Sequence, residues 1–408
     1  MRPDVSAARG PAWVLVAGGF HQRGGMDKAN AALADLLSER GCRVELVAHH
    51  FDPEYADERR FVPHAVPRPA GSFLLGELLL ERRGRAVAAA ASARPGGARV
   101  VVNGGNCLWD DVNWVHSVHH AWPAFDAGAP LWFRAKNRGV KAWARRRERA
   151  AITAARVVVV NSERTRRDVV EHLGVDPART RLVYLGADPD WGAPSPDERA
   201  AARAWIGAAP GQPVVAFVGA LSHDRNKGLD TLWRAWTALS TAGGGWDALL
   251  VVAGGGSGVA GWQAAADAAG LRDRVRFLGF TPRVRELLAA ADLLVSPARY
   301  EAYGLNVQEA VCRGVPAIVS ATAGIAERYP AELSPMVLAD PEDARELAVR
   351  LLAWRERAAE WRRRFEPFAG QLRAYGWRDM AADFVDAVSP DVGGAAERGE
   401  RAAAGAAR

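Results

Sequence analysis

Short apolar segments alternate with longer stretches rich in Ala, Leu and Arg along most of the chain. The apolar segments are rich in Val and Leu and show no regular alternation with polar residues, which is typical of strands buried on both faces of a parallel sheet. Such segments occur at 13–18, 43–48, 99–105, 156–162, 181–186, 213–220, 248–254, 275–280, 292–297, 316–321 and 335–340. Because the stretches between them have the composition of helices, the pattern predicts an α/β fold.

A segment rich in Pro, Gly and Asp at 186–213 interrupts this alternation, which then starts again. We interpret it as a link between two Rossmann-like domains in tandem, 13–190 and 191–375. The carboxyl ends of their strands are expected to face a shared cleft, where α/β sheets bind ligands. The two ends of the chain, 1–12 and 389–408, lack apolar periodicity and are predicted to be disordered.

Composition narrows the class of protein further. The chain has 408 residues, of which 49% are hydrophobic and 25% charged, as in a globular protein with more than one domain. No apolar run approaches the roughly 20 residues of a membrane span, and the first one reads as a strand rather than a signal peptide. Cys42, Cys107 and Cys312 are far apart, without the spacing of a metal site or a disulfide framework. We therefore expect a cytoplasmic protein.

Positive charge is concentrated in one stretch, 131–150, which contains eight basic residues and a single acid, Glu148. Apolar side chains are interleaved with them: Leu131, Trp132, Phe133, Val140 and Trp143. One interpretation is a helix of the first domain with a solvated basic face and a buried face that carries the Trp residues. The other is a helix on a membrane surface that binds anionic lipid. We favour the first, and both stay open.

A glycine-rich turn in the second half resembles a dinucleotide fingerprint. The segment AGGGSGVAG (253–261) contains Gly256-x-Gly258-x-x-Gly261 after a predicted strand. However, it follows the second strand of its half, and the next strand ends in RFLGF without the acidic residue that the fingerprint needs. We interpret it as a tight turn between strand and helix, and NAD binding is a remote alternative.

Two other segments combine strand ends with charge. In FVGALSHDRNKGLDTLWRAW (217–236), Arg225 and Lys227 precede a helix whose N–H groups suit a diphosphate. In RYEAYGLNVQEAVCRGVPAIVS (299–320), Glu301 and Glu309 flank a turn at Gly304, where a ligand can approach the backbone closely. One carboxylate can accept hydrogen bonds from sugar hydroxyls and the other from a vicinal diol such as a ribose. For any one of these side chains alone, a solvated loop or a helix-end charge is the simpler explanation.

Together these segments resemble the retaining glycosyltransferases of family four, which have the GT-B fold of two Rossmann-like domains. The resemblance covers most of residues 13–388. It is carried by the E-x7-E spacing of Glu301 and Glu309, FVGALSHDRNKG (217–228), LRDRVRFLGF (271–280) and VVVVNSERTRRDVVEHLGV…TRLVYLGAD (157–188). The family is too broad to indicate a substrate.

The resemblance implies roles in the second domain, which would bind the donor. Glu301 would contact the donor sugar, Glu309 the nucleotide ribose, and Lys227 and Arg225 the diphosphate. The backbone near Gly304 and Leu305 would hold the distal phosphate, and the base would lie near Gly279, at the end of the FLGF strand. The family usually has Arg directly after the strand's Gly, where this chain has Ala220. Arg225 would therefore substitute for it from a longer loop.

The resemblance also implies roles in the first domain, which would bind the acceptor. Gly24 and Gly25 would form a loop close to the donor phosphate and the acceptor. His116, in VNWVHSVHHAW (112–122), aligns with the family's active-site histidine, although His119 and His120 are nearby. The final helix, 376–388, would cross back to the first domain.

We therefore expect a retaining glycosyltransferase that needs no metal or other cofactor and transfers sugar from a nucleotide-diphosphate sugar to an acceptor hydroxyl. His116, Glu301 and Lys227 are its candidate catalytic residues. The acceptor, whether lipid, polysaccharide or small metabolite, stays open, and a nucleic acid is not expected. Within this scheme, contact with the inner membrane face through 131–150 stays an open alternative. The alternatives are a non-catalytic nucleotide-sugar-binding protein and a nucleotide-sugar epimerase of the same fold.

Overall fold

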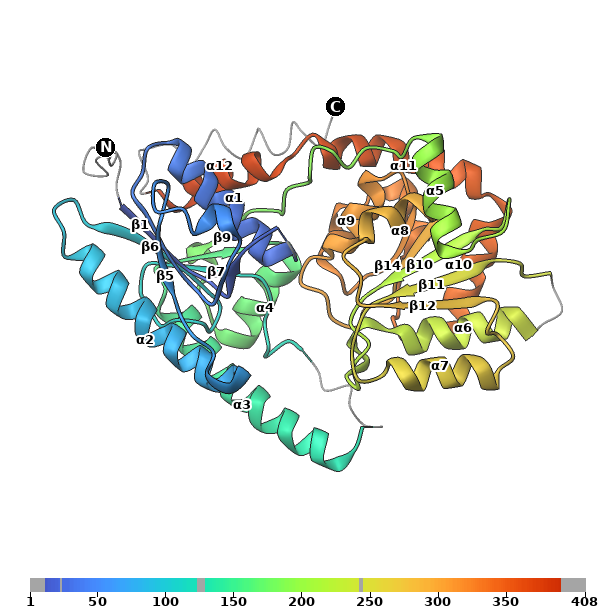
Figure 1. Cartoon of the computed structure of the whole chain (residues 1–408), viewed down its shortest axis with the longest axis horizontal. Coiled ribbons are helices and arrows are strands. Elements are labelled where there is room, and N and C mark those ends of the chain that lie inside the picture. The colour runs from blue at the N-terminus through green and yellow to red at the C-terminus, as the bar shows by residue number, and fades with distance from the viewer. Residues whose placement is uncertain (1–11, 23, 123–128, 242–244, 390–408) are drawn as a thin grey trace.

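The computed structural model describes residues 12–22, 24–122, 129–241 and 245–389. They form two lobes that lie side by side, each with a parallel sheet covered by helices (Figure 1). This confirms the predicted fold class, an α/β protein with two parallel sheets. The disorder predicted for 1–12 and 389–408 concerns residues that lie outside the described ones, apart from Ala12, which begins β1, and Ser389, which follows α12.

The N-terminal lobe contains a seven-stranded sheet in which every neighbouring pair is parallel. In spatial order its strands are β5 (Val62–Ala65), β3 (Val44–Ala48), β1 (Ala12–Val16), β6 (Ala98–Asn103), β7 (Val112–Val115), β8 (Val157–Val160) and β9 (Thr180–Leu182). A short separate pair consists of β2 (Gly19–Phe20) and β4 (His50–Phe51). The central strands are almost entirely buried, as their continuous Val and Leu content predicts.

The helices of this lobe are α1 (Gly25–Glu39), α2 (Phe73–Ser92), α3 (Leu131–Ala154) and α4 (Glu163–Leu173), with short 3-10 turns η2 (Pro53–Tyr55), η3 (Pro69–Gly71) and η4 (Pro177–Arg179). Local sequence fixes the ends of α4. The Ser162 hydroxyl accepts the Thr165 N–H at 2.9 Å, and Gly174 ends the helix in a left-handed conformation.

The C-terminal lobe contains a six-stranded parallel sheet, in the order β12 (Val275–Gly279), β11 (Leu249–Ala253), β10 (Val214–Val218), β13 (Leu293–Ser296), β14 (Ala317–Ser320) and β15 (Val337–Leu338). Its helices are α6 (Leu229–Thr241), α7 (Val259–Ala268), α8 (Val284–Ala290), α9 (Leu305–Cys312), α10 (Ala344–Glu356) and α11 (Ala358–Arg373). Three 3-10 turns complete it: η5 (Arg225–Lys227), η6 (Gly324–Arg328) and η7 (Ala331–Met336).

Two segments connect the lobes. The link predicted at 186–213 contains a helix, α5 (Pro196–Ile206), which begins at a Ser195 cap and packs on α8 of the C-terminal lobe. The last helix, α12 (Trp377–Val388), lies along α1 of the N-terminal lobe (Figure 1). Its Phe384 ring stands 4.4 Å from the ring of Trp114 on β7.

Direct contacts also join the lobes near the base of α4. The Glu327 carboxylate, from η6, accepts the N–H groups of Glu163 and Arg164 at 2.7 and 3.1 Å. The Ser162 hydroxyl donates to the carbonyl of Ala302 at 2.6 Å. A carboxylate of one lobe thus caps a helix of the other, an arrangement that favours close approach of the two lobes.

Helix α3 differs from the interpretation that we favoured for 131–150. It is one continuous helix, but only Glu148, Ala151 and Ile152 of its residues are buried. Leu131 and Trp132 are 78% and 65% exposed, so the Trp-bearing face is not buried along its length. The reason is geometric, because the N-terminal half of α3 extends beyond the sheet (Figure 1).

Candidate functional site

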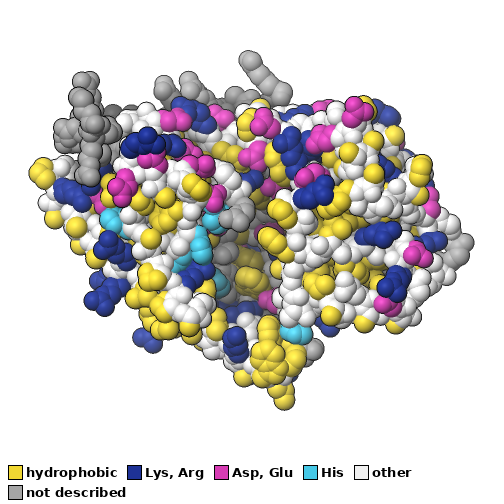
Figure 2. Space-filling view, in the orientation of Figure 1, with side chains coloured by type: hydrophobic (Ala, Val, Ile, Leu, Met, Phe, Trp, Pro, Cys, Tyr) yellow, Lys and Arg dark blue, Asp and Glu magenta, His cyan; other side chains and the backbone are white. Residues whose placement is uncertain are grey.

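A hollow separates the two lobes, with histidine side chains on the N-terminal wall (Figure 2). On the C-terminal wall, the Lys227 ammonium and the Glu301 carboxylate form an ion pair. Both residues follow strand ends, and Asn226 brings them together. Its side chain accepts the Tyr300 N–H at 3.0 Å and donates to the Tyr300 carbonyl at 2.9 Å. The two segments predicted to bind a diphosphate and a sugar therefore meet.

The turn between Glu301 and α9 requires glycine at position 304. Gly304 has φ 109°, and a Cβ there would lie 2.8 Å from Cγ2 of Ile325. No side chain caps α9, whose first residue is Leu305. The N–H groups of Val307 and Gln308 donate to the Gly304 carbonyl. Those of Leu305 and Asn306, with the partial positive charge of the helix start, are available to an anion.

Glu309, on α9, faces the other lobe. Its carboxylate lies 3.7 Å from the Lys28 ammonium of α1, and Lys28 also pairs with Asp188 at 2.8 Å. The Trp377 indole donates to Asp188 at 2.8 Å, which fixes that carboxylate. Burial raises the pKa of Glu309 to about 7, although Lys28 opposes the rise. Lys28 and Asp188 are site residues that sequence reasoning missed. The only available signal was the place of Lys28 one turn after Gly24.

The glycine loop of the N-terminal lobe reaches the same region. Gly24 has φ 80° and directly precedes α1. A Cβ on Gly25 would lie 3.0 Å from Cδ2 of Leu305, so a larger residue would crowd the start of α9. The structure therefore brings Gly25 and Leu305 together, as the predicted cross-cleft arrangement requires.

The Arg225 side chain lies apart from the pair of Lys227 and Glu301. The Arg225 side chain is 55% exposed and lies 3.9 Å from Asp230. It lines a separate concavity of about 560 Å³, together with Asp230, Trp233, Arg234, Trp262, Arg299 and Glu342. Gly279 ends β12 with φ 66°, and its carbonyl accepts the Gly254 N–H at 2.8 Å. The structure thus does not join Arg225 to the Lys227 cluster.

His116 lies just after β7 in an aromatic setting. Its ring is 4.8 Å from that of Trp114, and its carbonyl accepts from the Asn161 amide at 3.3 Å. Burial lowers the pKa of His116 to about 3, so the ring is neutral at physiological pH. Its Nε2 atom is buried and has no hydrogen-bond partner among the described residues.

The neighbouring histidines have a different environment. Both His119 and His120 contact Glu148, whose carboxylate is buried on α3. The sequence pattern indicated both histidines but not their partner. A lone acid among basic residues could have pointed to it, since Glu148 is the single acid in the stretch 131–150.

The glycine-rich turn after β11 supports the loop that precedes Lys227. A Cβ on Gly254 would lie 1.8 Å from the carbonyl oxygen of Gly219, and one on Gly256 would lie 2.4 Å from that of Leu221. The Leu221 N–H in turn donates to the carbonyl of Gly255 at 2.9 Å. Close backbone packing therefore accounts for these glycines.

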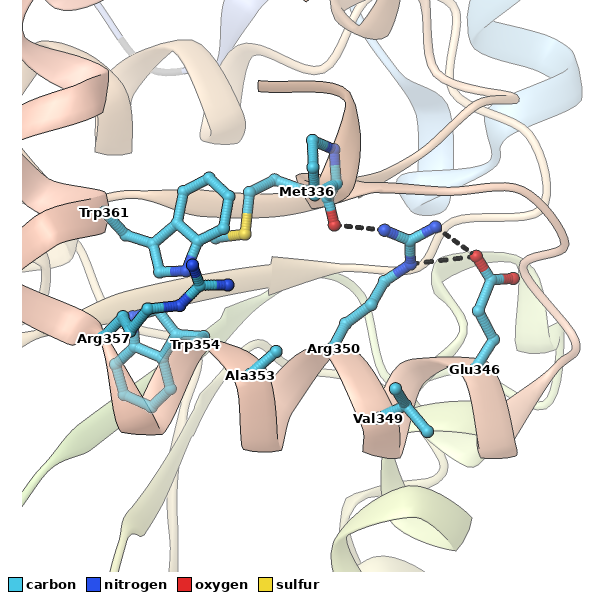
Figure 3. A pocket seen from close by; sticks show the side chains of 9 residues that line it. Met336, Glu346, Val349, Arg350, Ala353, Trp354, Arg357 and Trp361 are labelled. Atoms are coloured by element: carbon cyan, nitrogen blue, oxygen red, sulfur yellow. Dashed lines mark hydrogen bonds and ion pairs between the residues drawn. The ribbon is translucent and has the colours of Figure 1, made fainter. Parts of the chain in front are cut away.

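A further hollow of about 440 Å³ lies on the C-terminal lobe, away from the residues predicted to form the site (Figure 3). Two indoles, from Trp354 and Trp361, line it together with Met336. At its other end, Nε of Arg350 donates to the Glu346 carboxylate at 2.9 Å. None of the predicted site residues lines this hollow. In the described part of the chain, no cluster of three or more His, Cys, Asp or Glu side chains could hold a metal ion.

The fold and the site define a class of protein, the GT-B proteins, in which two parallel α/β lobes face a cleft. Two family models match the chain in succession: Glycosyltransferase Family 4 over residues 23–191 and Glycosyl transferases group 1 over residues 198–370. Between them they span both lobes. The chain belongs to glycosyltransferase family four.

Curated relatives match over part of their length. D-inositol 3-phosphate glycosyltransferase from Mycobacterium sp. (strain KMS) is 37% identical over 187 residues, which are 44% of this chain and 40% of that protein. The 2-deoxystreptamine glucosyltransferase of Streptomyces kanamyceticus is 30% identical over 206 residues, 49% of this chain and 51% of that protein. The matches thus cover about two fifths to one half of these relatives.

Solved structures match over nearly the whole fold. The lipopolysaccharide glycosyltransferase WaaG gives a TM-score of 0.72 at 23% identity, covering 91% of this chain and 99% of that one. HepE from Anabaena, in complex with UDP and glucose, gives 0.67 at 18% identity, covering 94% and 100%. At these identities the likeness concerns the fold.

Proposed function

We propose that the protein transfers a sugar from a nucleotide-diphosphate sugar to an acceptor hydroxyl, with retention of configuration and without a metal ion. The observation that carries this proposal is the ion pair of Lys227 and Glu301 beside the uncapped start of α9. It provides a cation and the N–H groups of Leu305 and Asn306 for a diphosphate, and a carboxylate for sugar hydroxyls. Membership of family four and the GT-B fold support it.

The chemistry that these groups can supply is electrostatic. Negative charge builds on the diphosphate as the glycosidic bond breaks, and preorganised positive groups stabilise it there. Lys227 and the N–H groups that follow Gly304 fill this role, so the leaving group does not depend on a metal ion. Retention follows if the acceptor attacks from the side of the leaving group while a donor phosphate oxygen takes the proton. The family resemblance implies this route.

Glu309 and Lys28 would act at the nucleotide end of the donor. An ionised Glu309 can accept hydrogen bonds from both hydroxyls of a ribose. Its pKa of about 7 means that donor binding competes with protonation near neutral pH. The Lys28 ammonium, 3.7 Å away, favours the ionised form and belongs to the opposite lobe. Closure of the lobes would therefore favour the charge state that grips the ribose.

The acceptor is expected on the N-terminal wall, near Gly24, Gly25 and His116. The molecules named for the curated relatives, D-inositol 3-phosphate and 2-deoxystreptamine, are the first acceptors to test. UDP-sugars are the first donors to test, because HepE was solved with UDP and glucose.

The enzyme is further proposed to be cytoplasmic and to contact the inner membrane face through α3. In the described ranges no helix is long and apolar enough to cross a membrane. Apolar side chains are nevertheless exposed on α3 and on the adjacent start of α2: Leu131 (78%), Trp132 (65%), Phe73 (52%), Leu75 (50%), Leu78 (48%) and Leu74 (41%). The Phe73 and Trp143 rings lie 6.3 Å apart, so the two helices share one surface. Its basic surroundings suit anionic lipid.

A transfer assay tests the catalytic proposal. Purified protein is screened by thermal shift against UDP-, GDP-, ADP- and TDP-sugars, and the donor that stabilises it is incubated with an acceptor panel. Lys227→Ala and Glu309→Ala should each lose most transfer while their circular dichroism stays that of the wild type. Normal rates in both variants would refute the proposal. Donor binding without transfer would favour a non-catalytic binding protein, and conversion of the donor without acceptor would favour an epimerase.

Vesicle sedimentation tests the membrane contact separately. Vesicles with about one third anionic lipid should bind the wild type and release it at high salt. Replacing Leu131 and Trp132 by Ser should weaken binding several-fold. Val349→Ser, at an equally exposed apolar position on α10, is the matched control and should not. Equal binding by both variants would contradict the proposed surface.

A further inference from the structure

Glu148 is almost fully buried, with 1% of its surface exposed, and its carboxylate accepts four N–H groups. One oxygen accepts the main-chain N–H and the Nδ1 of His119, both at 2.8 Å. The other accepts the main-chain N–H of His120 at 3.2 Å and its Nδ1 at 2.8 Å. One carboxylate on α3 therefore fixes both the backbone and the rings of two neighbouring histidines.

These bonds decide which ring nitrogen is free. Burial alone would raise the pKa of Glu148, but the hydrogen bonds and charge of His119, with the bond from His120, hold it below its ordinary value. Glu148 is then ionised at neutral pH and can only accept, so each Nδ1 carries a hydrogen. In each ring, Nε2 is the nitrogen that is not bonded to Glu148. Neither Nε2 has a hydrogen-bond partner among the described residues.

The histidine pair lies on the cleft wall that faces the donor side. The main-chain N–H of Val118 donates to the Tyr300 hydroxyl at 2.7 Å, and the Trp122 ring stacks on Tyr300 at 6.0 Å. His119 stacks on Trp122 at 6.3 Å. Tyr300 directly precedes Glu301, so this short segment spans the hollow at the level of the proposed donor sugar.

The other charged side chains near this loop have partners of their own and do not pair with Glu148. Lys141 lies 3.6 Å from Asp224, and Arg164 pairs with Asp168 at 3.2 Å. Arg145 donates to main-chain carbonyls, those of His119 at 2.9 Å and Trp122 at 3.1 Å. The charged or titratable groups that contact this loop, or pair with those that do, are, from α3, Lys141, Arg145 and Glu148; from α4, Arg164 and Asp168; and from the C-terminal lobe, Asp224 and Tyr300.

A buried carboxylate is costly without a compensating charge. Among the described residues, only the two imidazoles contact the oxygens of Glu148 with groups that can become cationic. Because each Nδ1 is bonded to Glu148, the Nε2 atom of each ring is the one on the far side from the carboxylate. The Arg145 guanidinium adds a positive charge beside the loop through its bonds to the carbonyls of His119 and Trp122. His119 is 41% exposed and His120 19%, so a ligand can reach the two rings.

We propose that the Nε2 edges of His119 and His120 bind an anionic group of the acceptor, such as a phosphate or a carboxylate, and that Glu148 is the positioning residue that orients both rings. This inference rests on the proposed function for its place in the reaction. It narrows the acceptor to an alcohol that carries a negative group a few ångströms from the hydroxyl that attacks. The binding step itself needs neither donor nor transfer.

Sulfate is the probe, because it keeps its charge between about pH 6 and about pH 8, where histidine titrates. Its binding to the full chain is measured by calorimetry at both pH values. The double variant His119→Asn, His120→Asn keeps an amide nitrogen in place of each Nδ1, so the bonds to Glu148 persist while Nε2 is lost. His172→Asn, at an exposed position on α4, is the matched control.

Wild type and His172→Asn should bind sulfate roughly tenfold more tightly at the lower pH, and the double variant should lose this gain. The donor side of the cleft is intact in all three proteins, so any sulfate bound there contributes equally and cancels in the comparison. Equal affinity in the double variant, or affinity independent of pH, would overturn the proposal. An inactive protein that still shows the pH-dependent difference would leave this site standing and refute only the proposed transfer.

The role of Glu148 has its own readout. Glu148→Gln retains the shape but lacks the negative charge that favours imidazolium, so the rise in sulfate affinity should move to a lower pH. Glu148→Asp retains the charge and should restore part of the profile. Unchanged profiles in both variants would contradict the positioning role. If Glu148→Gln does not fold, the histidine double variant still decides the question.

Discussion

The two walls of the cleft are built in different ways. On the C-terminal wall, Lys227 and Glu301 follow neighbouring strands, β10 and β13, and the sheet itself brings them together. On the N-terminal wall, His119 and His120 are held by Glu148, a side chain of a helix that follows them by 29 and 28 residues. Strand order thus places the first set, whereas one buried carboxylate places the second.

The largest expected effect concerns the C-terminal wall. Lys227→Ala removes the cation at the proposed leaving group, and kcat should fall by about 10²–10³, as when one preorganised donor to a developing oxyanion is lost. Steady-state kinetics with the identified donor measure this. Arg272→Ala, an 83% exposed cation of the same lobe, is the control and should keep the wild-type rate. If Lys227→Ala kept a kcat within a factor of three of wild type, Lys227 would not stabilise the leaving group, and the contrast between the two walls would not hold.

Glu309→Gln should show that the C-terminal wall is built for function at a cost in stability. The pKa of Glu309 is raised to about 7 from 4.5, so the folded state holds an extra proton between these values. Stability therefore falls as pH rises through this window and stays lower above it, by about 3 kcal/mol at most. A glutamine does not titrate, so the variant should unfold at higher urea than wild type above pH 7, with no such difference below about pH 4.5.

The control for this measurement is Glu332→Gln, which changes an exposed carboxylate of the same lobe. It should leave the pH dependence of unfolding unchanged. Identical urea midpoints for Glu309→Gln and wild type at pH 8 would show that Lys28 fully compensates the buried charge.

Gly304→Ala tests the turn between the two glutamates. The alanine would need φ 109° and would place its Cβ 2.8 Å from Ile325, so we expect a loss of about 1–3 kcal/mol in the free energy of unfolding. Donor affinity should fall as well, because the start of α9 shifts. The matched variant is Gly261→Ala, in α7, where a Cβ meets nothing within 4 Å. It should be neutral or slightly stabilising.

His116→Phe sharpens the contrast within the N-terminal wall. With a pKa of about 3, His116 is neutral from pH 5 to 9, so it can act only as a neutral hydrogen-bonding group. The variant should lose roughly tenfold in kcat/KM, the value of one hydrogen bond, at every pH in that range. A loss that changed with pH would mean that His116 titrates in the complex. His119→Asn, in contrast, should alter the pH profile of KM for an anionic acceptor.

The smallest expected effect lies outside the cleft. Trp132→Ala should change the free energy of unfolding by less than about 0.5 kcal/mol, because the side chain is 65% exposed. Trp236→Ala, at a fully buried position, should lose about 3–5 kcal/mol. Urea denaturation compares the two. A large loss at Trp132 would mean that α3 depends on that ring for folding rather than for docking.

Much of this architecture can be read from the chain. Each of the eleven apolar runs overlaps an observed strand, and the parallel sheets agree with the fold that they predict. The missed strands are short or polar: β5 contains Pro63, β7 contains Asn113, and β2 and β4 have two residues each. Asn113 is tolerated in a buried strand because its amide donates to the carbonyl of Gly104 at 2.9 Å. Such a partner cannot be foreseen from the pattern.

The sequence by itself determined the fold class and the family, and it placed Lys227 and Glu301 after strand ends, since strand ends and helix starts follow from local periodicity. Only the tertiary structure decided that Lys28 faces Glu309, that Arg225 lies apart, and that Glu148 holds two histidines. The physical reason is that these relations depend on how separate helices and lobes pack. The free energy of a charged group depends on the side chains that pack beside it in space, and residue spacing along the chain does not specify those neighbours.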